Sequence, residues 1–284
     1  MAATGIFRKI HPVTSPDALF LLVFLVALIL RFLFLDYKLF HHDEAIHAWF
    51  SYELLTKGTY VYDPMYHGPL LYYATAWIFS LLGQSDAAGR LLPALAGTAI
   101  VPLVYAVYRL GYLDGRQALI AALFVAVSPD LVYFSRFLRH DIFQLFFSLL
   151  LLVALLAYLE RGKTAYAIVA GLAAGAGMCL KEDMPLFLLV LAVFGIYIAL
   201  RRDVPFPRAW KRDGAIGALV ALGVISLFYS SLGAHPEVLW TGAQKAYAHW
   251  TAMHGQCRIC GPWFFYVLLF LLYEVPIFAL AIFS

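Results

Sequence analysis

Charge is scarce in this chain of 284 residues: 13% of it is Asp, Glu, Lys or Arg, while 63% is hydrophobic. An ordinary soluble domain carries about twice that share of charge, so the composition excludes this class and indicates a polytopic membrane protein. The net charge of +3 is too small to suggest a nucleic-acid partner. The chain also lacks a repeat of fixed period and a low-complexity segment.

Cysteine is scarce too, with three in the whole chain. Cys179 lies in an apolar run, where we expect it to be a packing residue. Cys257 and Cys260 form a single Cys-x-x-C. A disulfide or free thiols are favoured there over zinc, because a structural zinc site needs four ligands.

Long apolar runs dominate the rest. A spanning helix needs about 17–25 mostly apolar residues, and the runs predict an all-α protein with eight spans, near 16–35, 89–109, 117–134, 142–159, 164–180, 184–200, 214–233 and 263–283. The stretch 69–83 is short and rich in Tyr and Trp, which favours a juxtamembrane helix at headgroup level. We therefore expect a single membrane domain over 1–284, with outer loops over 36–88 and 234–262 and a basic cytoplasmic loop over 201–213.

The distribution of Lys and Arg predicts the orientation. If 69–83 does not cross the membrane, the N-terminus and the links after the second, fourth and sixth spans share one side. That side collects eleven Lys and Arg residues against eight on the other, so the positive-inside rule makes it cytoplasmic. If 69–83 crossed, the basic loop over 201–213 would face outside. We expect an integral plasma-membrane protein with a cytoplasmic N-terminus and its polar chemistry on the extracytoplasmic face.

Four polar clusters fall on that outer face. They contain His42, Asp43, Glu44 and His47; Asp63 and His67; Arg136, Arg139 and Asp141; and Lys181 and Glu182. Each also has a purely structural interpretation: Asp43 could cap a helix that Gly58 ends, and the two arginines could snorkel beside a salt-bridged carboxylate. The presence of four polar clusters on one membrane face favours a single joint site over four unrelated structural roles.

The residue types suggest a class of chemistry. Two carboxylates can activate an acceptor and order a cation, or steady a developing oxocarbenium ion. Arg and Lys beside them can hold a phosphate. Such a site at the membrane edge suits a lipid phosphate that carries a sugar. The residues identify no certain cofactor, and a divalent cation could be held by His42, Asp43, His47, His67 and Asp141.

The order of the motifs resembles the membrane glycosyltransferases of clan C (GT-C), in the branch of protein O-mannosyltransferases and aminoarabinose transferases. The matching motifs, over roughly 16–200, are Asp43-Glu44, Gly68-Pro69-Leu70, Arg90-Leu91-Leu92-Pro93 and Ser135-Arg136…Asp141. The stretches HHDEAIHAWFSYELL, YDPMYHGPLLYY and FSRFLRHD most resemble an archaeal and bacterial subgroup of flippase-activity-associated proteins of surface glycosylation.

The resemblance implies an enzyme that moves a sugar from a polyprenyl phosphate to an acceptor outside the membrane. It implies Asp43 as the base that activates the acceptor, with Glu44 and Asp141 at the donor or cation. Arg136, Arg139 and Lys181 are then candidates for the phosphate. The alternative is a non-catalytic factor that binds or helps to translocate lipid-linked sugars. Either role implies membrane lipids as partners, with proteins of a glycosylation pathway as further candidates.

Two departures from the family stand out. Gly68 occupies the position of the second proline in the family's Pro-Pro-Leu element, which weakens the transfer of a specific donor contact to this turn. Family members also continue beyond this length, whereas this chain ends at Ser284 within an apolar run. We therefore expect a fragment or a truncated relative.

Overall fold

The computed structural model of the protein describes residues 15–275, apart from 59, 202–203, 256–260 and 263, together with 277 and 279. The described residues form helices joined by turns and loops, without a strand among them, so the all-α prediction is confirmed. Cys257 and Cys260 lie outside the described residues. The helices are α1 (Ser15–Phe32), α2 (His42–Lys57), η1 (Pro64–Tyr66), α3 (Leu70–Leu82), α4 (Asp86–Leu110), α5 (Gly115–Val127), α6 (Pro129–Phe134), α7 (His140–Arg161), α8 (Thr164–Met178), α9 (Met184–Arg201), α10 (Trp210–Tyr229), α11 (Val238–His254) and α12 (Phe265–Tyr273).

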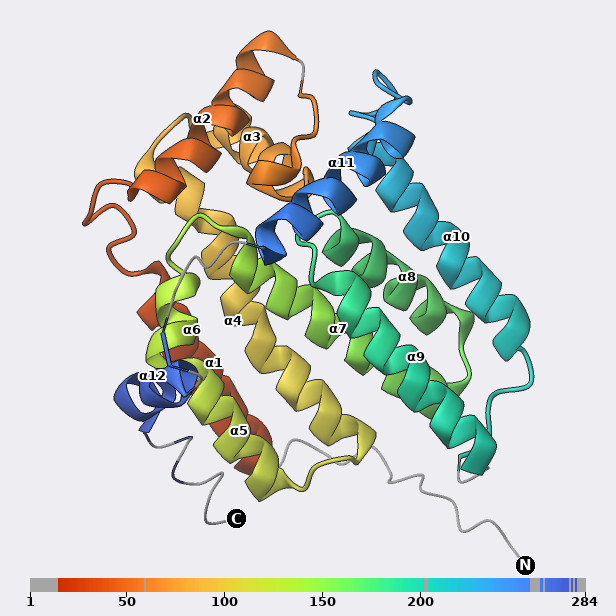
Figure 1. Cartoon of the computed structure of the whole chain (residues 1–284). Coiled ribbons are helices and arrows are strands. Elements are labelled where there is room, and N and C mark those ends of the chain that lie inside the picture. The colour runs from red at the N-terminus through yellow and green to blue at the C-terminus, as the bar shows by residue number, and fades with distance from the viewer. Residues whose placement is uncertain are drawn as a thin grey trace, which may run out of the picture.

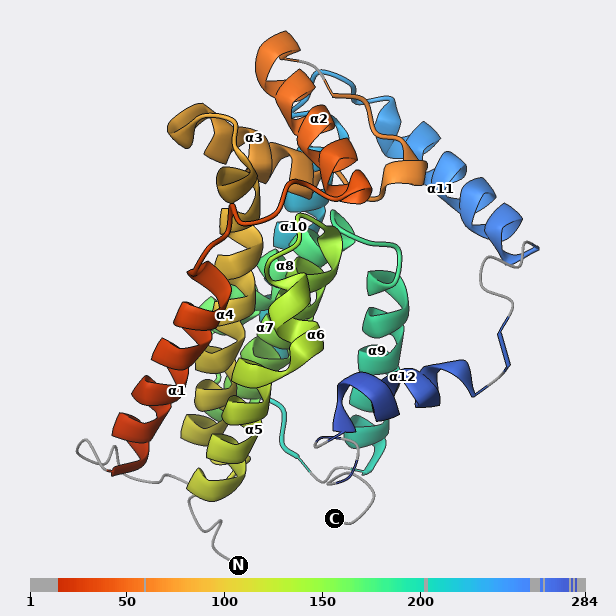
Figure 2. The same ribbon diagram turned by 90° about the vertical axis from the view of Figure 1, so that its left-hand side faces the viewer.

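The long helices run up and down between two ends of the molecule (Figure 1). At the upper end, α2 and α3 lie over the bundle, and α11 crosses beside them (Figures 1 and 2). The α6–α7 and α8–α9 junctions are at this end as well. The links from α4 to α5, from α7 to α8 and from α9 to α10 lie at the lower end. The connectivity thus gathers the four predicted polar clusters at one end of the bundle.

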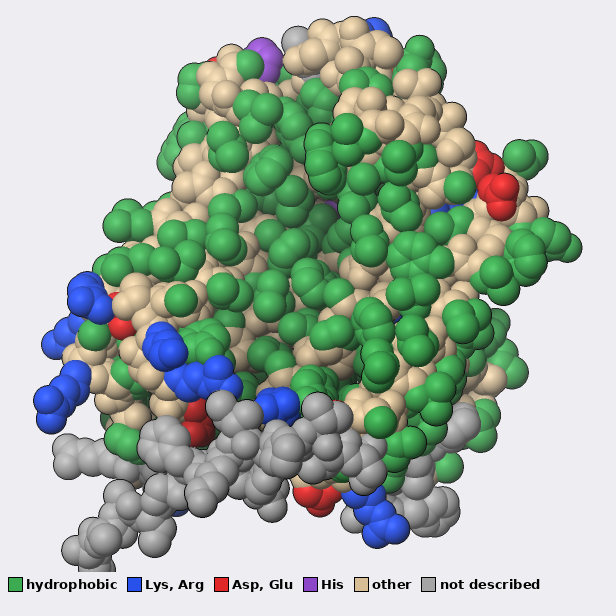
Figure 3. Space-filling model, turned by 180° about the vertical axis from the view of Figure 1, so that it is seen from behind, with side chains coloured by type: hydrophobic (Ala, Val, Ile, Leu, Met, Phe, Trp, Pro, Cys, Tyr) green, Lys and Arg blue, Asp and Glu red, His purple; other side chains and the backbone are tan. Residues whose placement is uncertain are grey.

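The surface agrees with a membrane environment. Within the described residues, four helices are long and apolar enough to cross a bilayer: α4, α7, α9 and α10. Hydrophobic side chains cover the middle of the face opposite to that of Figure 1, and Lys and Arg gather toward the lower end (Figure 3). Among the described residues, the Lys and Arg residues on the three lower links and the adjoining helix ends are Arg109, Arg116, Arg161, Lys163, Arg201, Arg208, Lys211 and Arg212.

Small residues bring helices α8 and α10 close together. A Cβ atom on Gly171 of α8 would lie 2.2 Å from the carbonyl oxygen of Gly217 on α10. One on Gly175, a turn further along, would lie 2.8 Å from the Cβ of Val224. Backbones approach this closely only over glycine, which is how helices commonly pack in membranes. This contact fixes α8, whose upper end leads into Lys181 and Glu182.

The prediction of eight spans is not confirmed. The expected span over 117–134 is broken into α5 and α6 at Pro129, which has no N–H to continue the helix. The hydroxyl of Ser128 caps the new helix by accepting from Leu131 N. The described part of the last expected span, 263–283, contains α12, whose nine residues are too few to cross a bilayer. Glu274 ends α12 and accepts hydrogen bonds from the Ser128 hydroxyl and from Asp130 N.

The juxtamembrane helices form as expected. The stretch 69–83 becomes α3, whose 13 residues are shorter than a span needs. Gly58 ends α2 in the left-handed conformation, with φ of 69°. The proposed cap at its other end is wrong, because the N-cap of α2 is His41 and not Asp43. The His41 ring nitrogen accepts from Asp43 N, and Glu44 accepts from His41 N.

Candidate active site

The segment of residues 60–69, which contains η1 and which we call the strap, lies between α2 and α3 at the upper end. Its start is held by the Ser231 hydroxyl, which donates to the carbonyl oxygen of Tyr60. Its end pairs with the α8–α9 junction: Gly68 N donates to Leu180 O at 2.9 Å, and Leu70 N donates to Cys179 O at 3.0 Å. The strap therefore joins the second polar cluster to the fourth.

Gly68 is explained by this docking. A Cβ atom at Gly68 would lie 2.2 Å from the carbonyl oxygen of Cys179, so any side chain there would push the strap away. A proline would also remove the N–H that bonds to Leu180. The departure from the family's Pro-Pro-Leu element thus has a local cause, which is the close backbone contact.

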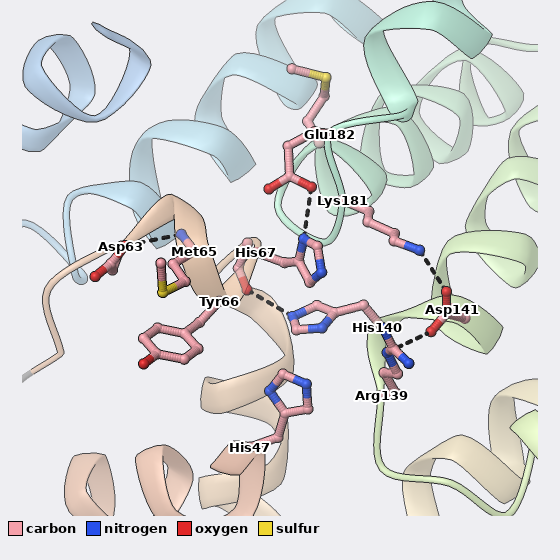
Figure 4. A network of polar contacts seen from close by, with 12 residues as sticks. His47, Asp63, Met65, Tyr66, His67, Arg139, His140, Asp141, Lys181 and Glu182 are labelled. Carbon is pink, nitrogen blue, oxygen red and sulfur yellow. Dashed lines mark hydrogen bonds and ion pairs between the residues drawn. The ribbon is translucent and has the colours of Figure 1, made fainter. Parts of the chain in front are cut away.

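His67, the residue before it, is held in an unusual conformation. Its φ of 65° and ψ of −162° lie in a region that residues other than glycine rarely adopt. Holding a residue there costs about 1–3 kcal/mol. The conformation places its ring Nδ1 2.8 Å from Oε2 of Glu182 (Figure 4). Burial alone would raise the pKa of Glu182, but the hydrogen bond from His67 holds that pKa below its ordinary value. His67 therefore donates to an ionised carboxylate.

A row of alternating charges lies beside this pair. Lys181 Nζ lies 2.5 Å from Asp141 Oδ1, and Arg139 Nε lies 3.2 Å from Asp141 Oδ2 (Figure 4). The same guanidinium reaches back to α2, with NH1 3.3 Å from Asp43 Oδ2. All four side chains are partly open to solvent, which leaves them accessible to a ligand. Asp43 of the first predicted cluster, Arg139 and Asp141 of the third and Lys181 of the fourth thus meet in one row.

Three imidazoles lie behind the row, from His67 through His140 to His47 (Figure 4). Their ring centroids are 5.2 Å and 5.0 Å apart. Tyr72 donates its only hydroxyl proton to Tyr66 O at 2.5 Å, so its oxygen accepts from His47 Nδ1 at 3.0 Å. Burial, with the nearby charge of His67, lowers the pKa of His47 to about 4. His47 is therefore neutral at neutral pH.

Glu44 does not share the site with Asp43. Its side chain is buried, and it pairs with Arg90 through two hydrogen bonds of 2.8 Å and 2.7 Å. It also accepts from Leu138 N at 3.0 Å and from His41 N. Although burial opposes ionisation, these bonds hold the pKa of Glu44 below its ordinary value. Glu44 thus joins α2, α4 and the α6–α7 junction, which favours a structural role, and the catalytic role expected from the sequence stays a prediction.

Arg136 is also placed differently from the phosphate role assigned to it. Its guanidinium donates to four carbonyl oxygens at the end of α1, those of Leu30, Arg31, Leu33 and Phe34. Leu30 and Arg31 lie in the last turn of α1, where a helix leaves carbonyl groups without a partner, and Leu33 and Phe34 follow the helix directly. Arg136 therefore caps the end of α1, and its guanidinium is engaged there by four carbonyl oxygens.

A mostly apolar pocket opens next to the row. It has a volume of about 440 Å³ and lies among α8, α9, α10 and α11. Lys181 and Glu182 supply its charged groups, and Tyr62 of the strap closes one side. The other lining residues are Met178, Pro185, Leu186, Ile225, Tyr229, Val238, Leu239, Gly242, Ala243, Ala246, Tyr247 and Trp250. An apolar pocket with one charged edge is suited to an amphipathic ligand.

The remaining predicted residues lie at the margin. His42 is exposed at the start of α2, with no side-chain hydrogen bond or ion pair among the described residues. Asp63 caps η1 by accepting from Met65 N at 2.9 Å, and it is directed away from the row (Figure 4). Sequence reasoning missed His140, which is fully buried and donates from Nε2 to Gly68 O at 3.1 Å. Its position beside Arg139 and Asp141 in the sequence was the available signal.

The described residues do not fit a metal site. No group of three or more His, Cys, Asp and Glu side chains among them is placed to hold an ion. The two carboxylates that face one another, Asp43 and Asp141, already share the guanidinium of Arg139. A divalent cation would have to displace that group. The divalent cation considered from the sequence thus stays a prediction.

The sequence profile of the dolichyl-phosphate-mannose-protein mannosyltransferase family matches residues 66–231, more than half of the chain. The chain belongs to this family. The match begins in the strap and ends after α10, so it includes His67, Arg139, Asp141 and Lys181 but not Asp43. A comparison with curated proteins finds no significant match.

Two solved structures share the fold. The S. cerevisiae protein O-mannosyltransferase Pmt1–Pmt2 complex bound to the sugar donor matches with a TM-score of 0.61 at 16% identity, over 83% of this chain and 35% of that one. The Archaeoglobus fulgidus oligosaccharyltransferase in complex with Zn and sulfate matches with a TM-score of 0.60 at 16% identity, over 83% of this chain and 36% of that one. The GT-C resemblance is thus confirmed, and the chain is an integral membrane protein that spans about a third of the length of either structure.

Proposed function

We propose that this chain is the membrane core of a glycosyltransferase that takes a sugar from a polyprenyl phosphate and passes it to an acceptor on the extracytoplasmic face of the plasma membrane. The observation that carries the proposal is the apolar pocket with Lys181 and Glu182 at its edge. A prenyl chain would lie among the apolar residues of α9, α10 and α11. Its phosphate would then meet the ammonium group of Lys181.

Arg139 completes the anion site in this proposal. It flanks Asp141 on the side opposite to Lys181, so Asp141 holds both cations apart and oriented. A phosphodiester oxygen can accept from the planar guanidinium and from the ammonium group together. Lys181 and Arg139, rather than Arg136, are therefore the groups we assign to the phosphate.

Asp43 is the base in the proposed reaction. The oxygen of an acceptor hydroxyl attacks the anomeric carbon, and its proton passes to the carboxylate of Asp43. The bond between the anomeric carbon and the phosphate oxygen breaks, and the polyprenyl phosphate leaves with the bonding electrons. Arg139 lies between Asp43 and Asp141, so it can stabilise the negative charge that grows on the departing phosphate.

The orientation follows from the charges of the two ends. Lys and Arg residues mark the lower links, so the positive-inside rule favours a cytoplasmic lower end. The row of charged side chains is at the other end. The site would then take its lipid donor from the outer leaflet.

The test separates binding from transfer. The purified protein in nanodiscs is given a radiolabelled polyprenyl-phosphate sugar, and both bound donor and transferred sugar are measured. We expect Asp43→Asn to abolish transfer and to keep donor binding, whereas Lys181→Ala weakens binding. Asp36→Asn, at an exposed carboxylate in the α1–α2 link, is the matched control and leaves both unchanged. Undiminished transfer by Asp43→Asn would remove this residue from the mechanism. Tight donor binding without turnover in the unmutated chain would favour the non-catalytic alternative.

A further inference from the structure

The strap is held by two different elements at Gly68, the residue after His67. Gly68 N donates to the carbonyl oxygen of Leu180 in the α8–α9 junction at 2.9 Å. The ring Nε2 of His140, at the start of α7, donates to the carbonyl oxygen of Gly68 at 3.1 Å (Figure 4). Because a carbonyl oxygen only accepts hydrogen bonds, Nε2 must carry the ring proton. His140 thus links α7 to the strap.

His140 is a side chain that the proposed reaction does not use. It is fully buried, and it lies directly before Asp141, which holds Lys181 and Arg139 in the row. Its other ring nitrogen, Nδ1, has no hydrogen-bond partner among the described residues. A buried polar group without a partner is costly and calls for an explanation. Within the described part of the chain, the bond to Gly68 is the side-chain hydrogen bond that His140 makes, so we look for its role there.

The backbone of His67 needs such support. Its φ of 65° lies in the left-handed region that favours glycine, and a strained conformation persists only when its surroundings hold it in place. Leu180 holds the peptide group between His67 and Gly68, and His140 holds the next peptide group. Two consecutive peptide groups are thus fixed by two different elements. Without His140, we expect His67 to relax toward an ordinary backbone conformation and its ring to leave its present partner.

The partner of His67 lies in the proposed donor site. Glu182 lines the apolar pocket together with Lys181, and its Oε2 lies 2.8 Å from His67 Nδ1. A carboxylate released from His67 would be attracted to the ammonium group of Lys181, its neighbour in the chain. There it would compete with a phosphate for the same cation. By holding Glu182, His67 keeps Lys181 available to Asp141 and to a phosphate.

We propose that His140 is a positioning residue for donor binding that acts through the strap. Its hydrogen bond to Gly68 holds His67 on Glu182, and that carboxylate is thereby kept from Lys181. This inference rests on the proposed function, in which Lys181 binds the donor phosphate. His140 is not among the residues that line the apolar pocket, so it acts without touching the donor.

The test measures the strap and the donor separately, on the full chain in nanodiscs. Hydrogen exchange followed by mass spectrometry, without donor, reports whether the amides of Gly68 and Leu70 stay docked. The Kd of a radiolabelled polyprenyl-phosphate sugar reports donor binding. Because one hydrogen bond is lost, we expect His140→Leu to speed exchange in the strap and to raise the Kd about fivefold. His140→Gln should keep both near the values of the unmutated chain, because its side-chain amide can donate in place of Nε2.

A second substitution distinguishes positioning from a general loss of stability. In a chain that already carries Glu182→Gln, no carboxylate competes for Lys181, so adding His140→Leu should not raise the Kd further. Damage to the fold would add to the effect of Glu182→Gln instead. Gln144→Leu is the matched control, because Gln144 is buried one turn further along α7 and its side chain donates to Met184 Sδ and not to the strap. We expect this variant to change neither measurement.

The pair His140→Asn and His140→Gln keeps the test decisive if His140→Leu does not fold, which thermal unfolding would show. Both variants place a primary amide at position 140, but the Asn side chain is one methylene group shorter and does not reach the carbonyl oxygen of Gly68. Of these two variants, we expect only His140→Asn to show faster exchange in the strap and a raised Kd.

The outcomes separate this inference from the proposed function. Unchanged exchange of the strap in His140→Leu, or a raised Kd that Glu182→Gln does not suppress, would overturn the inference. If exchange becomes faster while the Kd for the donor stays the same, the inference fails and the proposed function stands. If the unmutated chain binds no polyprenyl-phosphate sugar, the proposed function and this inference both fail.

Discussion

Arg139 links Asp43 on α2 to the start of α7: its NH1 lies 3.3 Å from Asp43 Oδ2, and its Nε lies 3.2 Å from Asp141 Oδ2. The proposed base is thus held by a cation that also faces the proposed phosphate site. When a phosphate takes part of the guanidinium's hydrogen bonding, Asp43 becomes freer to accept a proton. Donor binding and activation of the acceptor are coupled through one side chain in this arrangement.

The first prediction compares two neighbouring arginines. Arg139→Ala should weaken donor binding by roughly tenfold or more, because a hydrogen bond to a charged group contributes about 1.5–3 kcal/mol. Arg136→Ala should leave donor affinity unchanged and lower the melting temperature, because it uncaps the end of α1. Donor affinity and thermal unfolding are measured on the same nanodisc samples. Equal loss of donor affinity in both variants would contradict the assignment of Arg136 to the α1 cap.

The second prediction compares two neighbouring carboxylates. Glu44→Gln should lower the free energy of unfolding by about 3–5 kcal/mol, because it leaves the guanidinium of Arg90 buried without its partner charge. Asp43→Asn should change stability far less, since the Asp43 side chain is 37% exposed and its ion pair is open to solvent. Thermal or denaturant unfolding in detergent checks both. A stable Glu44→Gln variant that has lost only transfer would restore Glu44 to the active site.

The fold was largely predictable because its signals are local. Apolar runs, Gly58 and the aromatic stretch before Gly83 mark the elements where the structure has them. The break at Pro129 could have been predicted, because proline removes a helix hydrogen bond. The long apolar run on both sides of it favoured one continuous span instead. The end of α12 at Glu274 was not predictable in the same way, because Glu274 contacts Ser128, a residue far from it in the sequence.

The site was only partly predictable, because residue type does not reveal which partner a side chain meets. Asp43 and Glu44 are adjacent and acidic, yet a helix directs them to different surroundings, one toward Arg139 and the other toward Arg90. Arg136 and Arg139 diverge in the same way, because the chain turns between Phe134 and His140 instead of continuing as a helix. The role of His67 required the backbone conformation that the docked strap imposes.

The third prediction concerns pH. The pKa of His47 is lowered to about 4 in the folded protein, from an ordinary value near 6.5. Between these values the unfolded chain binds a proton that the folded chain does not, so His47 makes stability fall as pH drops from about 6.5 to 4. We expect the melting temperature to decline over this window, and His47→Gln to flatten the decline. His42→Gln, at an exposed histidine five residues earlier on the same helix, is the control and should keep the full slope. An unchanged slope in His47→Gln would show that another group titrates.

The last prediction concerns the orientation of the chain in the membrane. Lys38 and Lys245 are exposed at the upper end, in the α1–α2 link and on α11, whereas Arg161 and Arg208 are exposed at the lower end. Single cysteines are introduced at these positions after Cys257 and Cys260 are replaced by serine, with the buried Cys179 retained. An impermeant maleimide added to intact cells should label positions 38 and 245 and should reach 161 and 208 only after lysis. Because α3 has 13 residues and lies with α2 over the upper end, the strap and the α8–α9 junction must share a side. Labelling of position 208 in intact cells would place the basic loop outside, against the positive-inside rule, and would move the proposed donor site to the cytoplasmic leaflet.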